Sequence, residues 1–208
     1  MARVGLLGGT FNPPHLGHLV CAQEARVQLG LDRVLLVPTH VPPHKAMEVE
    51  PGVAHRVAMC EAVAAADPRL GVSLVDVRRG GPSFTVDTLR GLHADAPGDE
   101  LTFIVGGDMA YSLPSWREPE AVLDLALLGV AEREDLSRED IAMQLAGLAG
   151  ADRRLRFFDM PRIDISSSFI RRRLAEGLPV RYLVPDVVAS YIQRQGLYTA
   201  PAPVGGQA

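Results

Sequence analysis

The chain alternates short apolar runs with longer segments that carry apolar residues at helical spacing. The runs at 4–7 and 34–37 are bounded by loop residues, a pattern typical of buried strands. Between them, apolar residues from Leu16 to Val27 recur every three or four positions, which predicts a helix that ends at Gly30. Further strands are predicted at 72–77, 101–105, 126–130 and 153–158.

Helices are predicted between these strands, and several have capping residues at their starts. Ser137 is placed to cap one helix, and Ser83 or Thr85 to cap another, because a hydroxyl oxygen there accepts a bond from a free backbone N–H. Gly80-Gly81-Pro82 predicts a turn before the second of these helices. The remaining helical segments are 53–67, part of 112–124, 137–149, a helix opened by 165–171, and 186–196.

This alternation predicts an α/β fold, a doubly wound and mostly parallel sheet with helices on both faces. We expect one domain over 1–198, whose C-terminal helical part covers about 165–198, and a disordered tail over 199–208. In such sheets ligands bind outside the carboxyl ends of the strands. The loops that follow predicted strands hold most of the unusual polar residues and are expected to share one cleft; they are 8–18, 38–45, 106–108 and 160–167.

Composition narrows the classes of function. With 208 residues, 47% of them hydrophobic, the chain can bury a sizeable core, and a net charge of −4 argues against a general binder of nucleic acid or of membrane surfaces. Cys21 and Cys60 are the two cysteines and form no CxxC pair, so disulfide and zinc roles are not expected. With no signal-peptide pattern and no apolar run of about eighteen residues, we expect a cytoplasmic protein. The oligomeric state is left open.

The segment 8–18, Gly-Gly-Thr-Phe-Asn-Pro-Pro-His-Leu-Gly-His, lies at a predicted strand-to-helix turn. Gly8 and Gly9 let a ligand approach the backbone, and His15 and His18 fall on one side of the helix start, where the dipole favours anions. These features predict a polyphosphate site. The segment is neither a Walker loop nor a G-x-G-x-x-G dinucleotide fingerprint. The alternative, two ordinary surface or capping histidines, is disfavoured by the combination.

The other candidates each have a plainer explanation. Serines at 166–168 with Arg171 form a helix start that could bind phosphate, or a simple cap followed by a charged helix face. Lys45 could neutralise a phosphate or be a solvated loop residue. Asp108 after two glycines could bind a ribose or cap a helix. Trp116 could stack on a flat ring or pack in the core. The start of 83–89, with Thr85, could hold a small anion or be an ordinary capping sequence.

Taken together, these elements resemble the bacterial nicotinate mononucleotide adenylyltransferases of the nucleotidyltransferase superfamily. The first histidine motif and the serine–arginine motif specify the superfamily, whereas the loop at 41–45, the helix start at 81–89 and Trp116 specify this member. The matching pieces are G-G-T-F-N-P-P-H-L-G-H at 8–18, V-P-P-H-K at 41–45, G-P-S-F-T-V-D-T-L at 81–89, G-G-D at 106–108, Trp116, I-S-S-S-F-I-R at 165–171, P-D-V-V-x-x-Y-I at 185–192 and G-L-Y at 196–198.

The resemblance implies a Rossmann-like nucleotidyltransferase fold and the synthesis of deamido-NAD and pyrophosphate from nicotinate mononucleotide and ATP. Mg²⁺ would arrive with ATP, with no ligand from protein side chains. Asn12 stands where the family often has Asp, so a charge or metal role there is in doubt. The implied catalytic residues are His15, His18 and Arg171. The implied ATP-binding residues are Gly8, Gly9, Thr10, Phe11, Gly106, Asp108, Ser166 and Ser167, and those for the mononucleotide are Thr39, His44, Lys45, Thr85 and Trp116.

Three alternatives to this function stay open. One is another adenylyltransferase with the same first motif, such as the phosphopantetheine enzyme, although that family is shorter and lacks the pieces at 41–45 and 83–89. Another is preference for the amide, nicotinamide mononucleotide. The third is a nucleotide-binding regulator without catalysis, which the presence of His15, His18 and Arg171 disfavours.

Overall fold

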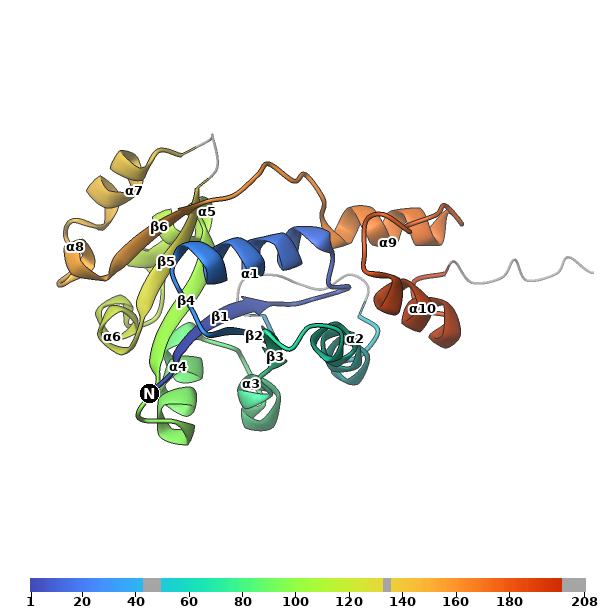
Figure 1. Cartoon of the computed structure of the whole chain (residues 1–208), viewed down its shortest axis with the longest axis horizontal. Coiled ribbons are helices and arrows are strands. Elements are labelled where there is room, and N and C mark those ends of the chain that lie inside the picture. Colours follow the sequence, from blue (N-terminus) through green and yellow to red (C-terminus); the bar gives the residue numbers. More distant parts are fainter. Residues whose placement is uncertain (43–49, 133–135, 200–208) are drawn as a thin grey trace, which may run out of the picture.

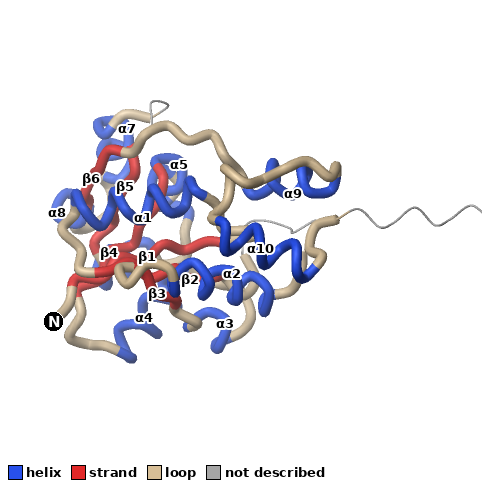
Figure 2. Tube along the Cα trace, turned by 45° about the vertical axis from the view of Figure 1, so that its right-hand side comes forward, coloured by secondary structure: helices blue, strands red, loops and turns tan. Residues whose placement is uncertain are grey.

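A single parallel sheet organises the molecule. The computed structural model describes residues 1–42, 50–132 and 136–199, and six strands within them form the sheet in the order β3-β2-β1-β4-β5-β6 (Figures 1 and 2). Every neighbouring pair is parallel, which confirms the predicted sheet. The strands are β1 (Arg3–Gly9), β2 (Arg33–Pro38), β3 (Leu70–Val72), β4 (Glu100–Gly106), β5 (Leu127–Glu132) and β6 (Leu155–Asp159).

Helices cover both faces of the sheet. The first group consists of α1 (Leu16–Gln28), α2 (Val53–Ala65), α9 (Ser167–Ala175) and α10 (Asp186–Gln195). The second consists of α3 (Val75–Arg79), α4 (Thr85–Asp95), α5 (Gly107–Tyr111), a 3₁₀ turn at Leu113–Ser115, α6 (Pro119–Leu125), α7 (Arg138–Leu145) and α8 (Ala151–Arg154). In the described ranges, no helix has both the length and the apolar content needed to cross a membrane.

The two helix groups bury alternate residues of the same strands. Leu6 packs in the core beside α4 and α6, whereas Leu7 packs in the core beside α1 and α2. Phe103 and Ile104 of β4 divide in the same way. Because the central strands are buried on both sides, they read as continuous apolar runs, which made them visible in the sequence.

Several predicted helix ends are confirmed. Gly30 has a φ of +64° just past α1, and the N–H of Leu31 reaches back to the carbonyl of Arg26 at 2.9 Å, as in a Schellman motif. Ser137 caps α7 and Ser166 caps α9, each through its hydroxyl oxygen.

Two predictions were wrong, and both concern the chain between β2 and β4. The predicted strand at 72–77 is a strand only to Val72 and then becomes α3, because Asp76 turns inward to bond Thr88 and Arg79. Neither Ser83 nor Thr85 caps α4: its N-cap is Phe84, and the Ser83 hydroxyl accepts a bond from the N–H of His40 instead. Tertiary contacts outweighed the local pattern at both places.

Helix α7 and the strand that follows it differ slightly from the expected boundaries. The helix predicted at 137–149 ends at Leu145, and the strand predicted from 153 begins at Leu155, since the short helix α8 precedes it. The tail over 200–208 lies outside the described residues, so its disorder stays a prediction.

The chain reverses its direction of winding between β1 and β4. From β1 the strands step to β2 and β3 on one side, and from β4 they step to β5 and β6 on the other. A crevice forms outside the carboxyl ends of the strands at such a point. The loops at 8–18 and 106–108 both begin there, and α9 lies at the same end of β1 (Figure 1).

The packing of β1 makes a direct prediction for Gly5. A Cβ at this position would lie 2.8 Å from Leu31 Cδ1 and 3.0 Å from both Ile104 Cδ1 and Val34 Cγ2, all of them buried. We therefore expect Gly5→Ala to destabilise the fold by about 1–3 kcal/mol through overpacking, measured by urea unfolding. Gly147→Ala is the control, because a Cβ there meets nothing within 4 Å. Equal stabilities for the two variants would contradict this account of the sheet.

Candidate active site

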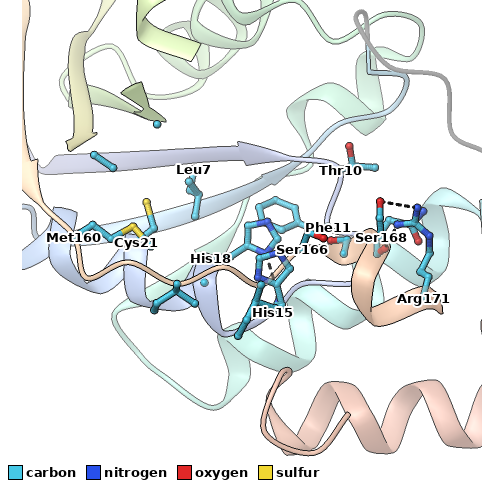
Figure 3. Close-up of a pocket in the computed structure, with 17 residues that line it drawn as sticks. Leu7, Thr10, Phe11, His15, His18, Cys21, Met160, Ser166, Ser168 and Arg171 are labelled. Atoms are coloured by element: carbon cyan, nitrogen blue, oxygen red, sulfur yellow. Dashed lines mark hydrogen bonds between the residues drawn. The ribbon is translucent and has the colours of Figure 1, made fainter. Parts of the chain in front are cut away.

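A cavity of about 550 Å³ lies at the carboxyl end of the sheet, between the loop after β1 and the start of α9. His15, His18 and Arg171 all line it, although Arg171 lies more than 150 residues from the two histidines in the chain (Figure 3). We call it the histidine cavity. None of the described residues that line it is acidic. The structure thus brings together the three groups that the sequence selected for a polyphosphate.

A second cavity of about 390 Å³ adjoins the first. Leu7, Thr10 and Gly106 line both, so the end of β1 lies between them. We call it the tryptophan cavity, after Trp116. Its other lining residues include Gly8, Gly9, Thr39, Pro42, Asp76, Ser83, Phe84, Thr85, Thr88, Phe103 and Arg117. The expected shared cleft is therefore a pair of neighbouring cavities.

The two histidines are held at the first turn of α1. His15 is its N-cap, and the rings of His15 and His18 stack with centroids 3.7 Å apart, while Phe11 meets the His18 ring edge-on at 5.0 Å. The backbone N–H of His15 donates to Nδ1 of His18 at 3.1 Å. Since Nδ1 accepts this bond, the proton of the neutral His18 ring is on Nε2. His18 therefore has an N–H donor on the side of the ring away from its own helix start.

The surroundings keep the His18 ring neutral. Burial lowers the pKa of His18 well below its ordinary value of 6.5, and the adjacent His15 ring lowers it further because two positive rings in contact repel each other. The bond to Nδ1 acts in the same direction, since a protonated Nδ1 could not accept it. At neutral pH this residue is a hydrogen-bond donor rather than a cation.

Two glycines give the aromatic rings of this motif their room. A Cβ on Gly17 would lie 3.1 Å from Nδ1 of His15, and one on Gly9 would lie 3.2 Å from the Phe11 ring. Gly17 therefore lets the His15 ring lie against the first turn of α1. Phe11 is buried at a φ of +50°, a conformation that non-glycine residues rarely adopt, so tight packing holds this turn.

The serines at the start of α9 have three different partners. Ser166 caps the helix by accepting from the N–H of Phe169 at 3.2 Å, Ser167 donates to the carbonyl of Pro13 at 2.8 Å, and Ser168 accepts from Nη2 of Arg171 at 3.2 Å. All three line the histidine cavity. Capping was thus a correct explanation for Ser166, and it coexists with a place at the cavity.

Arg171 joins the two motifs directly. Its Nη1 donates to the backbone carbonyl of Asn12 at 2.9 Å, while its Nε is buried and has no hydrogen-bond partner within the described part of the chain. Its bonds are to a carbonyl and a hydroxyl, and no carboxylate among the described residues is paired with its guanidinium. The charge is therefore available to an anion in the histidine cavity.

Trp116 packs partly against the core and partly lines the tryptophan cavity. Trp116 meets Phe103 edge-on with centroids 6.1 Å apart, and its Nε1 donates to Ser112 Oγ at 3.0 Å. The remaining ring surface lines the cavity beside Thr85, the first residue of α4. Thr39 also lines it, and its Oγ1 is buried without a hydrogen-bond partner among the described residues. A polar ligand in this cavity would supply that partner.

Some predicted site residues lie elsewhere. Gly8 and Gly9, implied for ATP, line the tryptophan cavity and not the histidine cavity. Asp108 is exposed on α5 and lines neither cavity, and Gly106, not Asp108, is the N-cap of that helix. Gly106 itself lines both cavities. His44 and Lys45 lie outside the described residues, so their place in the mononucleotide site stays a prediction.

Sequence reasoning missed two buried charged residues beside the cavities. Arg56 is 1% exposed and Asp76 is 2% exposed. Arg56 shares the buried stripe of α2 with Cys60 and Val63, at spacings of four and seven residues. Its position on the apolar side of a predicted helix could have indicated that Arg56 is buried, but the helix was predicted from its apolar residues alone.

The described residues also bear on metal binding. Among them no group of three or more His, Cys, Asp or Glu side chains is arranged to hold an ion. The donors that line the histidine cavity are imidazole, hydroxyl and guanidinium groups, which can bind phosphate oxygens. Mg²⁺ instead needs oxygen ligands such as carboxylates.

Comparison with known proteins shows which proteins the chain resembles. Residues 6–173 match the family model described as cytidylyltransferase-like. The probable nicotinate-nucleotide adenylyltransferase of Thermomicrobium roseum is 44% identical over 198 residues, covering 95% of this chain and 92% of the relative. The protein of the same description from Herpetosiphon aurantiacus is 43% identical over 202 residues, covering 96% of this chain and 100% of the relative.

Solved structures share the fold. The nicotinic acid mononucleotide adenylyltransferase of Plasmodium falciparum, complexed with NaAD, matches with a TM-score of 0.75 over 95% of this chain and 98% of that one, at 17% identity. A putative nicotinate-nucleotide adenylyltransferase from Vibrio parahaemolyticus matches with a TM-score of 0.65 over 95% and 96%, at 18% identity. At such identities the likeness concerns the fold.

The environment of His18 predicts its titration. We expect the His18 ring to be neutral with its proton on Nε2 at pH 6.5, and to titrate below that value, as read from ¹⁵N shifts of the imidazole. Because the unfolded chain binds this proton more readily, the free energy of unfolding should rise with pH from the folded pKa up to about 6.5. His18→Gln should remove that contribution. A midpoint at or above 6.5 would show that His18 is stabilised as a cation instead.

Proposed function

The chain belongs to the nicotinate-nucleotide adenylyltransferase family, and we propose that its histidine cavity holds ATP while its tryptophan cavity holds nicotinate mononucleotide. The products are deamido-NAD and pyrophosphate, in a step of NAD biosynthesis. One observation carries the placement of the substrates. Two imidazoles, a guanidinium and two helix starts surround one cavity, and an aromatic, mostly apolar cavity opens beside it at the end of β1.

The reaction needs alignment more than proton transfer. A phosphate oxygen of the mononucleotide attacks the α-phosphorus of ATP and forms the new P–O bond, while the bond to the bridging oxygen breaks and pyrophosphate leaves with its electron pair. The attacking phosphate is already an anion at neutral pH and needs no general base. The protein must bring two anions into line and offset their repulsion.

The groups around the histidine cavity suit that task. The Nε2–H of neutral His18 can donate to an oxygen of the α-phosphate as charge develops there. Arg171 supplies a fixed positive charge, and the first turn of α1 adds the positive end of its dipole. His15 holds His18 in place by ring stacking and by its backbone N–H. Magnesium enters as part of the MgATP substrate and keeps water and phosphate ligands.

The acceptor side favours a ring that bears a carboxylate. Trp116 offers an aromatic face, and the start of α4 at Thr85 offers backbone N–H groups at the positive end of an eleven-residue helix. Arg117 lines the same cavity, but its guanidinium is already paired with Asp87 at 3.3 Å and with Glu118 at 3.7 Å. The N–H groups at the start of α4 therefore favour the acid over nicotinamide mononucleotide, whose amide carries no charge. Phosphopantetheine has no aromatic ring for Trp116. The cytoplasmic location stays a prediction.

The assay that tests this function measures pyrophosphate release from MgATP with each candidate acceptor. We expect turnover with nicotinate mononucleotide, much weaker turnover with nicotinamide mononucleotide and none with phosphopantetheine. His18→Ala should lower kcat by about 10²–10³-fold because it removes a donor to the transition state. His93→Ala, at an exposed position on α4, is the matched control. If no mononucleotide gives pyrophosphate release, the result would favour the nucleotide-binding regulator.

Replacing Trp116 distinguishes the ligands of the two cavities. We expect Trp116→Ala to weaken binding of nicotinate mononucleotide by about tenfold, through loss of the stacking surface, with ATP affinity nearly unchanged. Trp116→Phe retains an aromatic ring and should recover most of the affinity. Isothermal titration with each ligand separately makes the comparison. Weaker ATP binding with intact mononucleotide binding would assign this ring to the adenine side.

A further inference from the structure

Arg56 is the largest side chain that the fold buries almost completely, and it lines neither cavity. It lies in the first turns of α2, between the loops that follow β1 and β2. We propose that Arg56 is a positioning residue that sets the distance between the ATP site and the mononucleotide site. This inference rests on the proposed assignment of the two cavities.

The hydrogen bonds of Arg56 reach three separate segments. Nη1 donates to the carbonyl of Thr10 at 2.9 Å and to that of Thr39 at 2.8 Å, and Nη2 donates to the carbonyl of His40 at 3.1 Å. Nε donates to Glu50 Oε1 at 3.0 Å in an ion pair. Three donor hydrogens of one planar group therefore hold the two strand-end loops at a fixed separation, and a fourth bonds Glu50.

The carbonyls that Arg56 holds belong to walls of both cavities. Thr10 lines both of them, and Thr39 lines the tryptophan cavity. His40 extends the connection, because its N–H donates to Ser83 Oγ at 2.9 Å, and Ser83 lies two residues before Thr85. A continuous path of hydrogen bonds thus runs from the β1 loop through Arg56 to the start of α4.

A guanidinium is the group that this arrangement requires. Its rigid fork directs donors to several acceptors in one plane, whereas a lysine ammonium is a single point at the end of a flexible chain. Burial of the charge is compensated by Glu50 and by three carbonyl dipoles. If Arg56 only filled space, an apolar side chain would do so without the cost of burying a charge, because the position belongs to the buried stripe of α2.

The expected kinetic effect follows from the position of Arg56. It contacts no ligand site directly, so each substrate should bind alone almost normally when Arg56 is changed. The attacking phosphate and the α-phosphorus must nevertheless meet in line, and a displacement of about 1 Å between reacting groups can lower the rate by about 10²-fold. Loss of a positioning residue is therefore expected to lower kcat while the dissociation constant of each substrate alone stays unchanged.

Arg56→Lys tests this distinction, with Arg69→Lys as the matched control. Arg69 forms an exposed ion pair with Asp67, outside both cavities. The measurements are kcat for pyrophosphate release and separate titrations with nicotinate mononucleotide and with an ATP analogue that cannot react. We expect a fall in kcat of about 10- to 100-fold, dissociation constants within threefold of the parent, and full binding stoichiometry. Arg69→Lys should match the parent in every measurement.

Two results would overturn the proposal: kcat within twofold of the parent in folded Arg56→Lys, or a loss that lies entirely in the dissociation constant of one ligand. The parent enzyme separates this outcome from failure of the proposed function, because a parent that releases no pyrophosphate refutes the function before any variant is compared. If Arg56→Lys binds with reduced stoichiometry, Glu50→Ala decides the matter.

Glu50→Ala removes one anchor of the guanidinium at a partly exposed site. We expect a three- to tenfold fall in kcat, with both dissociation constants retained, because the fork loses the bond that orients its Nε. In Arg56→Lys that folds, adding Glu50→Ala should lower kcat no further, since both changes act on the same contact. An unchanged kcat in Glu50→Ala, or additive losses in the double variant, would count against the path through Arg56.

Discussion

The site depends on which donors bind the carbonyl groups of the loop after β1. A turn that offers N–H groups to an anion directs carbonyls the other way, and each of them needs a donor. Here the carbonyl of Gly9 accepts from Thr39 N–H, that of Thr10 from Arg56, that of Asn12 from Arg171 and that of Pro13 from Ser167. The donors come from three distant segments, so the loop has its shape only when the whole fold is assembled.

Charged groups are distributed differently around the two cavities. The histidine cavity has the cation of Arg171 and a neutral donor at His18, with no acidic residue among its described lining. The tryptophan cavity contains one carboxylate, Asp76, which is bonded to Thr88 and paired with Arg79 at 2.9 Å. The buried acid is therefore offset by its partners and holds α3 against α4. A chain with a net negative charge can thus present a locally positive histidine cavity.

The sequence predicted the parts of the site that are local in the chain. About ten consecutive residues are enough to predict each of these parts, and all are confirmed: the strand before Gly8, the helix after His15 and the capped start of α9. The parts that depend on contacts between distant segments were not predictable in this way. Arg56 has partners at sequence separations of 6, 16, 17 and 46, and nothing near it reveals them. The wrong strand at 72–77 has the same cause, because Asp76 folds inward to meet Thr88, twelve residues later.

Asn12 shows how the C-terminal segment contributes to the first motif. Asn12 is 3% exposed, and its Oδ1 accepts from the hydroxyl of Tyr198 at 2.6 Å. Burial raises the pKa of Tyr198, so the phenol stays protonated and continues to donate. An aspartate could accept the same bond, but its charge would have to be desolvated in a site only 3% exposed, whereas the amide accepts without that cost. An amide at this position therefore keeps the connection between the loop after β1 and the segment that follows α10.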